Sequence, residues 1–406
     1  MESSQYDVII AGAGMVGAAM ACALGDKNLK VAVLERAQPQ LSWPEDSVDL
    51  RVSAISRSSE NFFRHLDAWD GMVARRVCPY TDMHVWEGVA DGEIHFDSAD
   101  IGESSMGHII ENRVIQASLL ERMQSFSNID FICPVNIEDI NVEQQVVEML
   151  LQGGRTLKAQ LLVGADGGRS QVREAMGITT VGWPYQQKGV VAVVETSLGH
   201  SSTAWQRFLA TGPLAFLPLS DGRCSIVWST THEQANELCN MDDEVFCRRL
   251  ADASEYKLGD VLNTTKRAAF PLKLQHAERY THHRMALIGD AAHMIHPLAG
   301  QGANLGFMDA ACLAEFVLEA VEQERDLGSM HHLRRYERWR KGSNLSMMFA
   351  MDGFKRLFSN DVSLLAKLRG YGLSLTGKFM PAKHAFMRRA MGLEGELPRL
   401  ARPPVV

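Results

Sequence analysis

Short apolar runs, most of them followed by a glycine or an acidic residue, recur along the chain. They occupy residues 6–10, 30–34, 161–163 and 284–289. Such near-continuous apolar runs are typical of strands buried on both faces of a parallel sheet. Farther along, Leu305, Met308, Cys312 and Phe316 recur at helical spacing and predict a helix that begins near residue 302. Together these patterns predict an α/β fold.

A second set of segments has the pattern of a β-rich domain. Residues 189–196 predict a strand, and residues 216–219 and 224–228 predict a hairpin across Asp221-Gly222. We therefore expect a discontinuous α/β domain made of residues 1–75, 101–184 and 274–330. A β-rich domain made of residues 76–100 and 185–273 is inserted in it, and residues 331–406 form a C-terminal helical segment.

Composition narrows the class of protein only slightly. The chain has 406 residues, of which 46% are hydrophobic and 22% charged, and its net charge is −8. These values are those of an ordinary globular protein, and they favour no nucleic-acid partner. The seven cysteines are scattered, odd in number and without a Cys-x-x-Cys pair, so we expect a cytoplasmic location, no disulfides and no metal site. The apolar stretch 8–24 contains three glycines and follows Glu2 and Asp7, so we interpret it as neither a signal peptide nor a membrane span.

The first apolar strand leads into a glycine pattern with a clear physical purpose. Gly12 allows a tight turn, Gly14 lets the backbone approach a pyrophosphate, and Gly17 lets a helix pack closely on the sheet. Glu35 ends the second strand, about 20 residues after the glycines, where a carboxylate accepts hydrogen bonds from ribose. The order strand, glycines, helix and acid predicts an adenine dinucleotide. Arg36 is either a cofactor contact or a solvated surface charge.

A second motif predicts the other half of the same cofactor. Asp290 follows the strand pattern 284–289, at the edge of the sheet where α/β proteins bind ligands, and can hold the ribityl chain of a flavin. The segment Gly302-Ala303-Asn304 begins the predicted helix and can bring backbone amides to the flavin ring. The two motifs together predict FAD. Asp290 as a simple turn cap, and Asp166 as a cap of its own turn, are the structural alternatives.

With these motifs in this order, the chain resembles the class A flavoprotein aromatic hydroxylases, which have the para-hydroxybenzoate hydroxylase-like FAD-binding fold. The segments 49–56, 107–112, 214–220 and 289–306 are similar to the ubiquinone-biosynthesis hydroxylases. The segments 224–229, 306–311 and 333–338 most resemble the 2-octaprenylphenol hydroxylase branch, which introduces the ring C5 oxygen. The resemblance implies flavin contacts at Glu35, Arg51, Asn112, Asp290 and residues 302–304. Asn112 departs from the wider class, which usually has Arg or Gln there.

The resemblance also implies an activity. We expect a monooxygenase in which NAD(P)H reduces FAD and one atom of O2 is transferred to the ring of a polyprenylphenol. The motif at Asp166 is implicated in both flavin and pyridine-nucleotide contact. His293, His296 and Pro297 lie beside the expected flavin, as candidates for proton transfer and for shaping the loop that faces the ring. A sister hydroxylase acting on another ring carbon, a flavin reductase of prenyl lipids and a scaffold in a biosynthetic complex remain alternatives.

The segment after residue 331 is rich in Met, Phe and Leu and carries many basic residues. Examples are Lys355, Arg356, Lys383, Arg388 and Arg389. A basic amphipathic stretch on an acidic protein indicates contact with an anionic membrane surface. A core-packing helix with a solvated basic face, or a homo-oligomer interface, explains the pattern equally well. The long apolar tail of the expected substrate favours a peripheral position on the inner membrane face.

Overall fold

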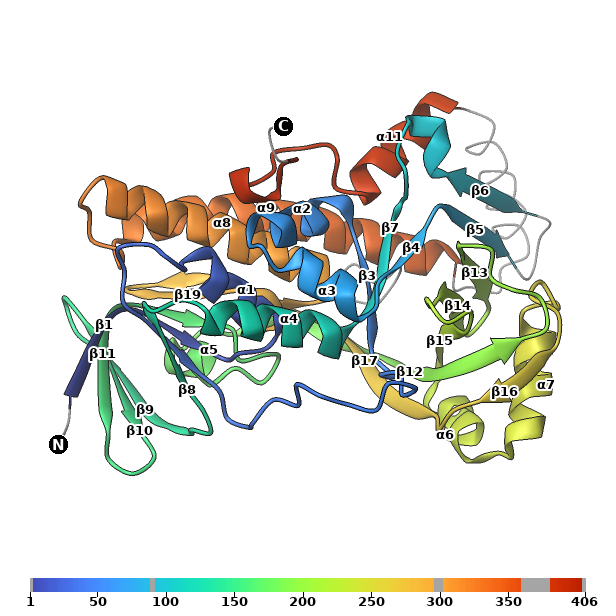
Figure 1. Ribbon diagram of the computed structural model, residues 1–406, viewed down its shortest axis with the longest axis horizontal. Coiled ribbons are helices and arrows are strands. Elements are labelled where there is room, and N and C mark those ends of the chain that lie inside the picture. Colours follow the sequence, from blue (N-terminus) through green and yellow to red (C-terminus); the bar gives the residue numbers. More distant parts are fainter. Residues whose placement is uncertain (1–2, 88–91, 296–301, 359–379, 404–406) are drawn as a thin grey trace.

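The structure is a computed structural model that describes residues 3–87, 92–295, 302–358 and 380–403. In Figure 1 an α/β part lies at the left and a β-rich part at the right, with two long strands passing from one to the other. The division into domains expected from the sequence stays a prediction. The strand pairing in the sheets, however, shows which segments of the chain are joined by hydrogen bonds.

The first sheet carries the predicted parallel strands. Its spatial order is β18 (Thr281–His282), β19 (Met285–Leu287), β11 (Thr156–Gly164), β1 (Ser3–Ala11), β2 (Val31–Leu34) and β8 (Ile129–Ile132), and the hairpin β9 (Ile137–Val142) and β10 (Val147–Leu151) pairs with the first half of β11. Strands β19, β11, β1, β2 and β8 are parallel to one another. All four residues of β2 are buried, as the near-continuous apolar pattern predicts.

Helices cover this sheet on the side of the glycine motif. Helix α1 (Met15–Ala23) packs against both α4 (Asn112–Gln124) and α8 (Gly302–Glu322), and α8 packs against α9 (Met330–Phe358). Figure 1 shows α8 and α9 running side by side along one face. Every residue of α1 from Gly17 to Ala23 is buried. Most of them are glycine or alanine, whose small size lets the neighbouring helices approach closely. The helix predicted to begin near residue 302 is confirmed.

One predicted strand is shorter than expected. Of residues 284–289, only Met285–Leu287 are in β19, and the turn η2 (Gly289–Ala291) follows. Arg284 and Gly289 have φ of 59° and 60°, a left-handed conformation that ends strand geometry on both sides. Arg284 instead forms an ion pair with Asp326 at 2.7 Å. The apolar pattern identified the buried centre of the strand but not its ends.

The second sheet contains the predicted hairpin. Its spatial order is β20 (His293–Met294), β17 (Ala268–Ala277), β12 (Thr180–Thr196), β15 (Cys224–Thr231), β14 (Gly212–Pro218), β13 (Thr203–Leu209), β5 (Asp82–Glu87) and β6 (Glu93–Asp97), with β16 (Val261–Thr264) beside β12. Strands β14 and β15 form the expected hairpin, closed by a hydrogen bond from the Gly222 amide to the Leu219 carbonyl. Helices α6 (His232–Asn240) and α7 (Asp243–Ala253) cover one face through Leu238, Phe246 and Leu250.

A small third sheet joins the two large ones. It consists of β3 (Val52–Ile55), β7 (Gly107–Glu111) and β4 (Cys78–Tyr80), all antiparallel. Ala54 and Ile109 from this sheet pack against Val193 and Leu217 from the second sheet. Helices α2 (Arg57–His65) and α3 (Trp69–Arg75) follow β3, and Ser56 caps α2 by accepting a hydrogen bond from the Ser59 amide.

The remaining helices are short. Helix α5 (Gln171–Ala175) follows β11, and α11 (Met380–Ala390) packs against the turn η1 (Ser98–Ile101) beside β6. A last turn, η4 (Arg399–Ala401), contacts α2 and α8. Lys383 of α11 is buried and forms an ion pair with Asp100 at 2.7 Å. In the described part of the chain, no helix is long and apolar enough to cross a membrane.

Candidate flavin site

The glycine motif forms a turn in which two of its three glycines leave no room for a side chain. Gly12 has φ of 104°, and a Cβ there would lie 2.5 Å from the Ala165 carbonyl oxygen. A Cβ on Gly17 would lie 1.9 Å from the Gly12 carbonyl oxygen. Gly14 differs, because a Cβ there would meet nothing within 4 Å. The open space beside Gly14, the N-cap of α1, is where a phosphate can approach the backbone.

The motifs from distant parts of the chain pack directly on one another. Val16 of α1 lies 3.3 Å from the position of a Cβ on Gly289 and 2.7 Å from that of a Cβ on Gly306. Ala165, which precedes Asp166, donates a hydrogen bond to the Ala11 carbonyl at 2.8 Å and leaves no room for a Cβ on Gly12 or Gly17. Residues near 12, 165, 289 and 306 therefore form one continuous contact. The glycine turn, the Asp166 turn and the Asp290 turn lie at a single site.

Glu35 is fixed against the glycine turn. Its Oε2 accepts a hydrogen bond from the Ala13 amide at 2.8 Å, and its Oε1 accepts one from the Arg36 amide at 2.8 Å. Oε1 also accepts a hydrogen bond from the Ala37 amide at 3.3 Å. A carboxylate offers about four acceptor positions, so about one remains for a ribose hydroxyl. The side chain of Arg36 is exposed. Whether it contacts a cofactor stays a prediction.

Arg51 and Asn112, both expected to contact the flavin, are neighbours, and their contact with a cofactor stays a prediction. The Asn112 amide donates to the Arg51 carbonyl at 2.9 Å, and Ser53 Oγ donates to Asn112 Oδ1 at 2.7 Å. One helical turn later, Gln116 Nε2 donates to the Ala13 carbonyl at 3.0 Å. Gln116 was not predicted from the sequence as part of the site. Its signal was available, because a residue four positions after Asn112 lies on the same helix face.

Asp290 lies in η2, at the turn that packs on α1. Although its side chain is exposed, the surrounding protein raises the pKa of its carboxyl by removing part of its hydration. Electrostatic interactions with His293, Arg51 and Lys273 act in the opposite direction. His293, a candidate for proton transfer, is only 2% exposed, and its Nε2 lies 2.5 Å from Asp309 Oδ2. His296 and Pro297 lie outside the described residues.

The start of α8 is tied to the small sheet by Asn304. Its side-chain Nδ2 donates to the Ala54 carbonyl at 2.8 Å, and its Oδ1 accepts from the Ser56 amide at 3.0 Å. This side chain is buried and has both polar atoms in use, so only backbone groups of Gly302, Ala303 and Asn304 remain to meet a flavin. Gly302, two residues before Asn304, has no side chain that would shield these backbone groups.

Asp166 caps the start of α5 with one carboxylate oxygen and leaves the other oxygen without a partner among the described residues. Asp166 Oδ2 accepts a hydrogen bond from the Val172 amide at 3.2 Å, whereas the buried Oδ1 has no hydrogen-bond partner in the described part of the chain. Burial raises the pKa of this carboxyl. Arg173 joins this turn to the Asp290 turn, because it donates to the Gly168 carbonyl at 3.0 Å and to the Ala291 carbonyl at 2.9 Å. A buried acceptor without a donor fits a bound hydroxyl group.

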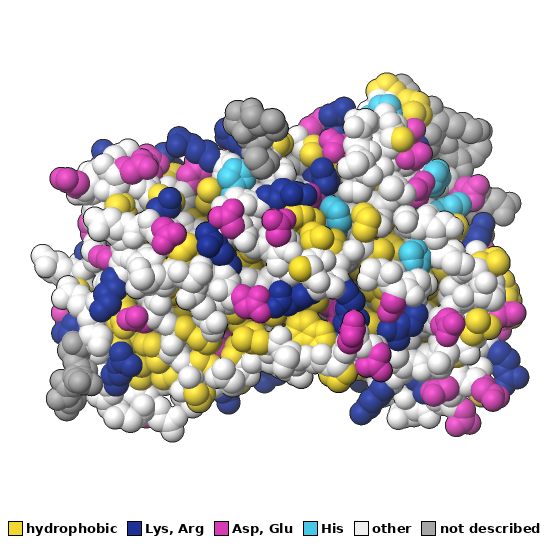
Figure 2. Space-filling view, in the orientation of Figure 1, with side chains coloured by type: hydrophobic (Ala, Val, Ile, Leu, Met, Phe, Trp, Pro, Cys, Tyr) yellow, Lys and Arg dark blue, Asp and Glu magenta, His cyan; other side chains and the backbone are white. Residues whose placement is uncertain are grey.

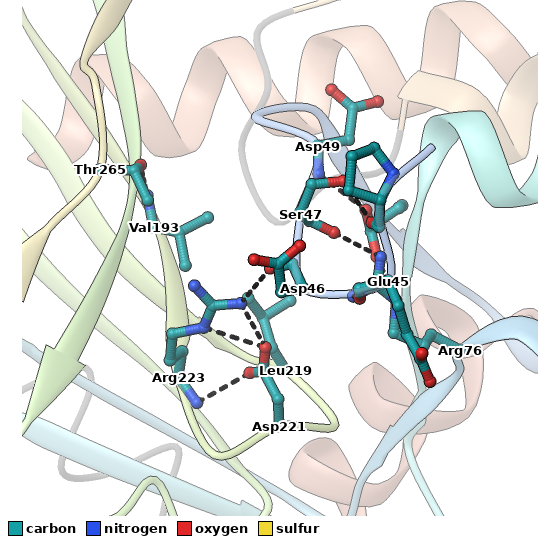
Figure 3. A network of polar contacts seen from close by, with 12 residues as sticks. Glu45, Asp46, Ser47, Asp49, Arg76, Val193, Leu219, Asp221, Arg223 and Thr265 are labelled. Carbon is teal, nitrogen blue, oxygen red and sulfur yellow. Dashed lines mark hydrogen bonds and ion pairs between the residues drawn. The ribbon is translucent and has the colours of Figure 1, made fainter. Parts of the chain in front are cut away.

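Two arginines hold the segment before Arg51, one directly after α3 and one in a hairpin turn (Figure 3). Arg76 donates to the carbonyls of Glu45 at 3.1 Å and Ser47 at 2.6 Å. Arg223, in the turn of the β14–β15 hairpin, donates to the Asp46 carbonyl at 3.3 Å. A small cavity lies beside these contacts. These bonds fix an otherwise irregular connection, and with it the position of Arg51.

The second sheet presents apolar side chains next to Arg51. The guanidinium carbon of Arg51 lies 6.0 Å from the centre of the Phe270 ring, which is 44% exposed. Phe270 pairs with Gly189, which is on the same face of β12 as the buried Val193. That face contacts the small sheet through Val193. On the face of the molecule shown in Figure 2, hydrophobic side chains also reach the surface between basic and acidic ones.

Comparison with known proteins identifies the class. Residues 5–344 match the family model described as FAD binding domain, and the chain therefore belongs to that family of FAD-dependent monooxygenases. It is 38% identical over 437 residues to the ubiquinone biosynthesis monooxygenase COQ6 of Danio rerio, covering 95% of this chain and 90% of the relative. It is 33% identical over 393 residues to the 3-demethoxyubiquinol 3-hydroxylase of Escherichia coli, covering 97% and 100%.

A solved structure confirms the fold. The p-nitrophenol 4-monooxygenase of Pseudomonas putida superposes with a TM-score of 0.79 over 98% of this chain and 100% of that chain, at 20% sequence identity. The predicted α/β, para-hydroxybenzoate hydroxylase-like fold is confirmed. The protein is an aromatic-ring monooxygenase with FAD as cofactor and NAD(P)H as co-substrate.

Proposed function

We propose that this protein hydroxylates the aromatic ring of a polyprenylphenol in ubiquinone biosynthesis, at ring carbon C5. The pathway is that of the relatives from Danio rerio and Escherichia coli. The observation that carries the proposal is the direct packing of the Gly12, Asp166 and Gly289 turns on one another, next to an apolar sheet face on which Phe270 and Trp183 are exposed. The choice of C5 rests on the three segments that resemble the 2-octaprenylphenol hydroxylase branch.

The described residues fit FAD at both of its ends. Gly14 and the start of α1 receive the pyrophosphate, and Glu35 receives a ribose hydroxyl. Asp290 and the unpartnered Asp166 Oδ1 are acceptors for hydroxyl groups of the ribityl chain. Arg51, Asn112 and the backbone of residues 302–304 lie toward the ring. When bound, FAD that has been reduced by NAD(P)H activates O2 for transfer of one oxygen atom to an electron-rich ring.

The face of the second sheet beside Arg51 is the proposed place for the substrate ring. Phe270, Leu272 and Leu274 alternate along β17 and therefore share this face. Trp183 pairs with Leu274 and extends the apolar strip. An apolar strip binds the phenol ring and excludes water from the reacting atoms, which favours oxygen transfer over loss of the activated oxygen to solvent.

The long apolar tail of such a substrate favours binding of the protein to a membrane surface, where the tail can stay in lipid. Phe349 is 74% exposed on α9, and Met380 is exposed at the start of α11. Arg388 and Arg389 are exposed on α11, so they are available to anionic lipid. Lys383, by contrast, is engaged with Asp100 and cannot serve as a free surface cation. Residues 359–379, which include Lys367, Arg369 and Lys378, lie outside the described residues.

Loss of the protein from cells is the experiment that tests this function. We expect quinone to fall and a prenylphenol that lacks one ring oxygen to accumulate, and the position of the missing oxygen identifies the carbon. Accumulation of a compound lacking an oxygen at a different carbon would indicate the sister hydroxylase. Normal quinone levels would overturn the pathway assignment.

A further inference from the structure

One side-chain oxygen on the apolar face of the second sheet lacks a hydrogen-bond donor. Gln187, in β12, is half-buried, and its Oε1 atom is buried without a partner in the part of the chain that the structure describes. Buried carbonyl oxygens are nearly always paired in native proteins, because water no longer solvates them. The unpaired Oε1 therefore fits a donor that a bound molecule supplies.

Gln187 lies on the sheet face that is next to Arg51. It pairs with Leu272 of β17. Two residues farther along β12, Gly189 pairs with Phe270 in the same register. Residues two apart on a strand share a face, so Gln187, Phe270 and Leu272 lie on one side of the sheet. The Phe270 ring centre is 6.0 Å from the guanidinium carbon of Arg51. Gln187 is therefore on the strip proposed to hold the substrate ring.

The orientation of the Gln187 amide is determined by its nitrogen. Nε2 donates a hydrogen bond to the carbonyl of Thr211, the residue before β14, at 2.5 Å. A backbone carbonyl can only accept, so the amide nitrogen and not the amide oxygen must face Thr211. The side chain is therefore held in one orientation, and Oε1 is directed away from this bond.

The residues paired with Gln187 carry no charge. Leu272 of β17 lies on one side and Thr231 of β15 on the other. Lys188, the next residue of β12, lies on the opposite face of the sheet, where it donates to Asn236 of α6 at 2.8 Å. Burying a cation without an anion is costly, so these surroundings favour a neutral donor. A phenol hydroxyl is a donor of this kind.

We propose that Gln187 orients the substrate: its Oε1 accepts a hydrogen bond from the phenol hydroxyl while the ring lies against Phe270 and Leu272. This inference rests on the proposed function and deepens it. A flat ring held only by apolar contacts can turn in its own plane. One hydrogen bond at the hydroxyl removes that freedom, and it thereby determines which ring carbon faces the flavin.

Three variants separate the acceptor oxygen from the size of the side chain. Gln187→Met has nearly the same length and no acceptor oxygen. Gln187→Glu keeps an acceptor oxygen at the same distance from the backbone. Gln160→Met is the matched control, because Gln160 of β11 also donates through Nε2, to Asp7 Oδ1 at 3.0 Å, but lies in the first sheet rather than the second.

The measurement is the dissociation constant of two ligands from the FAD-loaded, full-length protein, followed by flavin absorbance in the absence of NAD(P)H. The ligands are a short-chain prenylphenol and its O-methyl ether, which has the same ring but no hydrogen to donate. We expect the wild type, Gln160→Met and Gln187→Glu to bind the phenol roughly tenfold more tightly than the ether. Gln187→Met should bind the two ligands with affinities within about twofold of each other, because no acceptor remains.

The ratio of the two affinities distinguishes orientation of the substrate from a structural effect, because a structural defect weakens both ligands alike. Loss of the ratio in Gln187→Met alone supports the proposal. Equal affinities in the wild type, an unchanged ratio in Gln187→Met, or a lost ratio in Gln160→Met or Gln187→Glu overturns it and leaves the proposed function intact. Failure of the FAD-loaded wild type to bind either ligand overturns the proposed function itself. If Gln187→Met does not fold, Gln187→Leu takes its place.

Discussion

Glu35, at the end of β2, accepts a hydrogen bond from the backbone amide of Ala13 at 2.8 Å, so the predicted ribose-binding acid is also part of the glycine turn. Glu35→Ala removes both this bond and the proposed bond to ribose. Hydrogen bonds to a charged group contribute about 1.5–3 kcal/mol, so FAD should bind roughly 10- to 100-fold more weakly. Titration of the apoprotein with FAD, followed by flavin fluorescence, measures this change.

The opposite end of the same sheet offers a matched control. Asp7 Oδ2 accepts a hydrogen bond from the Lys30 amide at 2.7 Å, and Asp7 Oδ1 accepts one from Gln160 at 3.0 Å. Asp7→Ala should lower stability without changing the affinity for FAD. Equal loss of FAD affinity in both variants would show that Glu35 acts only through the stability of the sheet.

Two glycines of the same motif should respond differently to alanine. A Cβ on Gly14 would meet open space, so Gly14→Ala should fold with a stability change under about 1 kcal/mol. It should nevertheless bind FAD poorly, because the added methyl group occupies the space through which the pyrophosphate approaches the backbone. A Cβ on Gly17 would lie 1.9 Å from a backbone oxygen, so Gly17→Ala should fail to fold or unfold at much lower temperature. Thermal unfolding and FAD titration of both variants separate the two effects. Normal FAD affinity in Gly14→Ala would show that the pyrophosphate does not bind beside Gly14.

Acid should destabilise the protein through a largely buried, neutral histidine, even though the nearby Glu60 acts to raise its pKa. Burial lowers the pKa of His108, which packs edge-on against Trp69, to about 4. Its pKa in the folded protein is below that of an unfolded chain, about 6.5, so the unfolded chain binds the extra proton. The stabilisation, roughly 3 kcal/mol, is present above pH 6.5 and is lost as the pH falls from 6.5 toward 4. Urea unfolding of the apoprotein at a series of pH values measures it.

A substitution at His108 should remove part of that pH dependence. His108→Gln should flatten the curve of unfolding free energy by up to about 1.4 kcal/mol per pH unit near pH 5. His282 is exposed on β18 and serves as the control. An unchanged slope in His108→Gln, or an equal change in His282→Gln, would contradict a neutral buried His108.

The sequence predicted those parts of the site that depend on local patterns. The turn at Gly12, the carboxylate Glu35 at the end of β2 and the start of α8 each follow from residues a few positions apart. The β14–β15 hairpin is equally local. Each of these elements is determined by chain geometry over a single turn or strand, which is why periodicity and glycine spacing were sufficient.

The remaining features arise from contacts between distant residues. Arg340 reaches Asp309 only because α9 packs on α8, and no spacing in the sequence indicates this pair. The same holds for Asn304, whose side chain bonds to Ala54 and Ser56 rather than to a cofactor. Lys383 looked like a free surface cation in the sequence, but the packing of α11 on η1 buries it against Asp100. Side-chain partners of this kind follow from tertiary packing, which hydrophobic periodicity does not encode.

The proposed membrane contact depends on the exposed cations of α11. Each basic residue near an anionic bilayer contributes about 1 kcal/mol, so Arg388→Glu with Arg389→Glu should weaken binding to vesicles with anionic lipid by at least about tenfold. Sedimentation with such vesicles measures the change. Arg248→Glu with Lys266→Glu, on and beside α7, is the control of equal charge. Absence of wild-type binding, or equal loss in the control, would rule out a membrane surface at α11.

The proposed reaction transfers one oxygen atom of O2 to a prenylphenol ring. The most direct measurement supplies the FAD-loaded protein with NAD(P)H, a short-chain prenylphenol and 18O2, and analyses the product by mass spectrometry. We expect a product with a single 18O atom, bound to C5 of the ring. Oxidation of NAD(P)H with no consumption of O2 and no labelled ring, as a prenyl-lipid reductase would give, would contradict it.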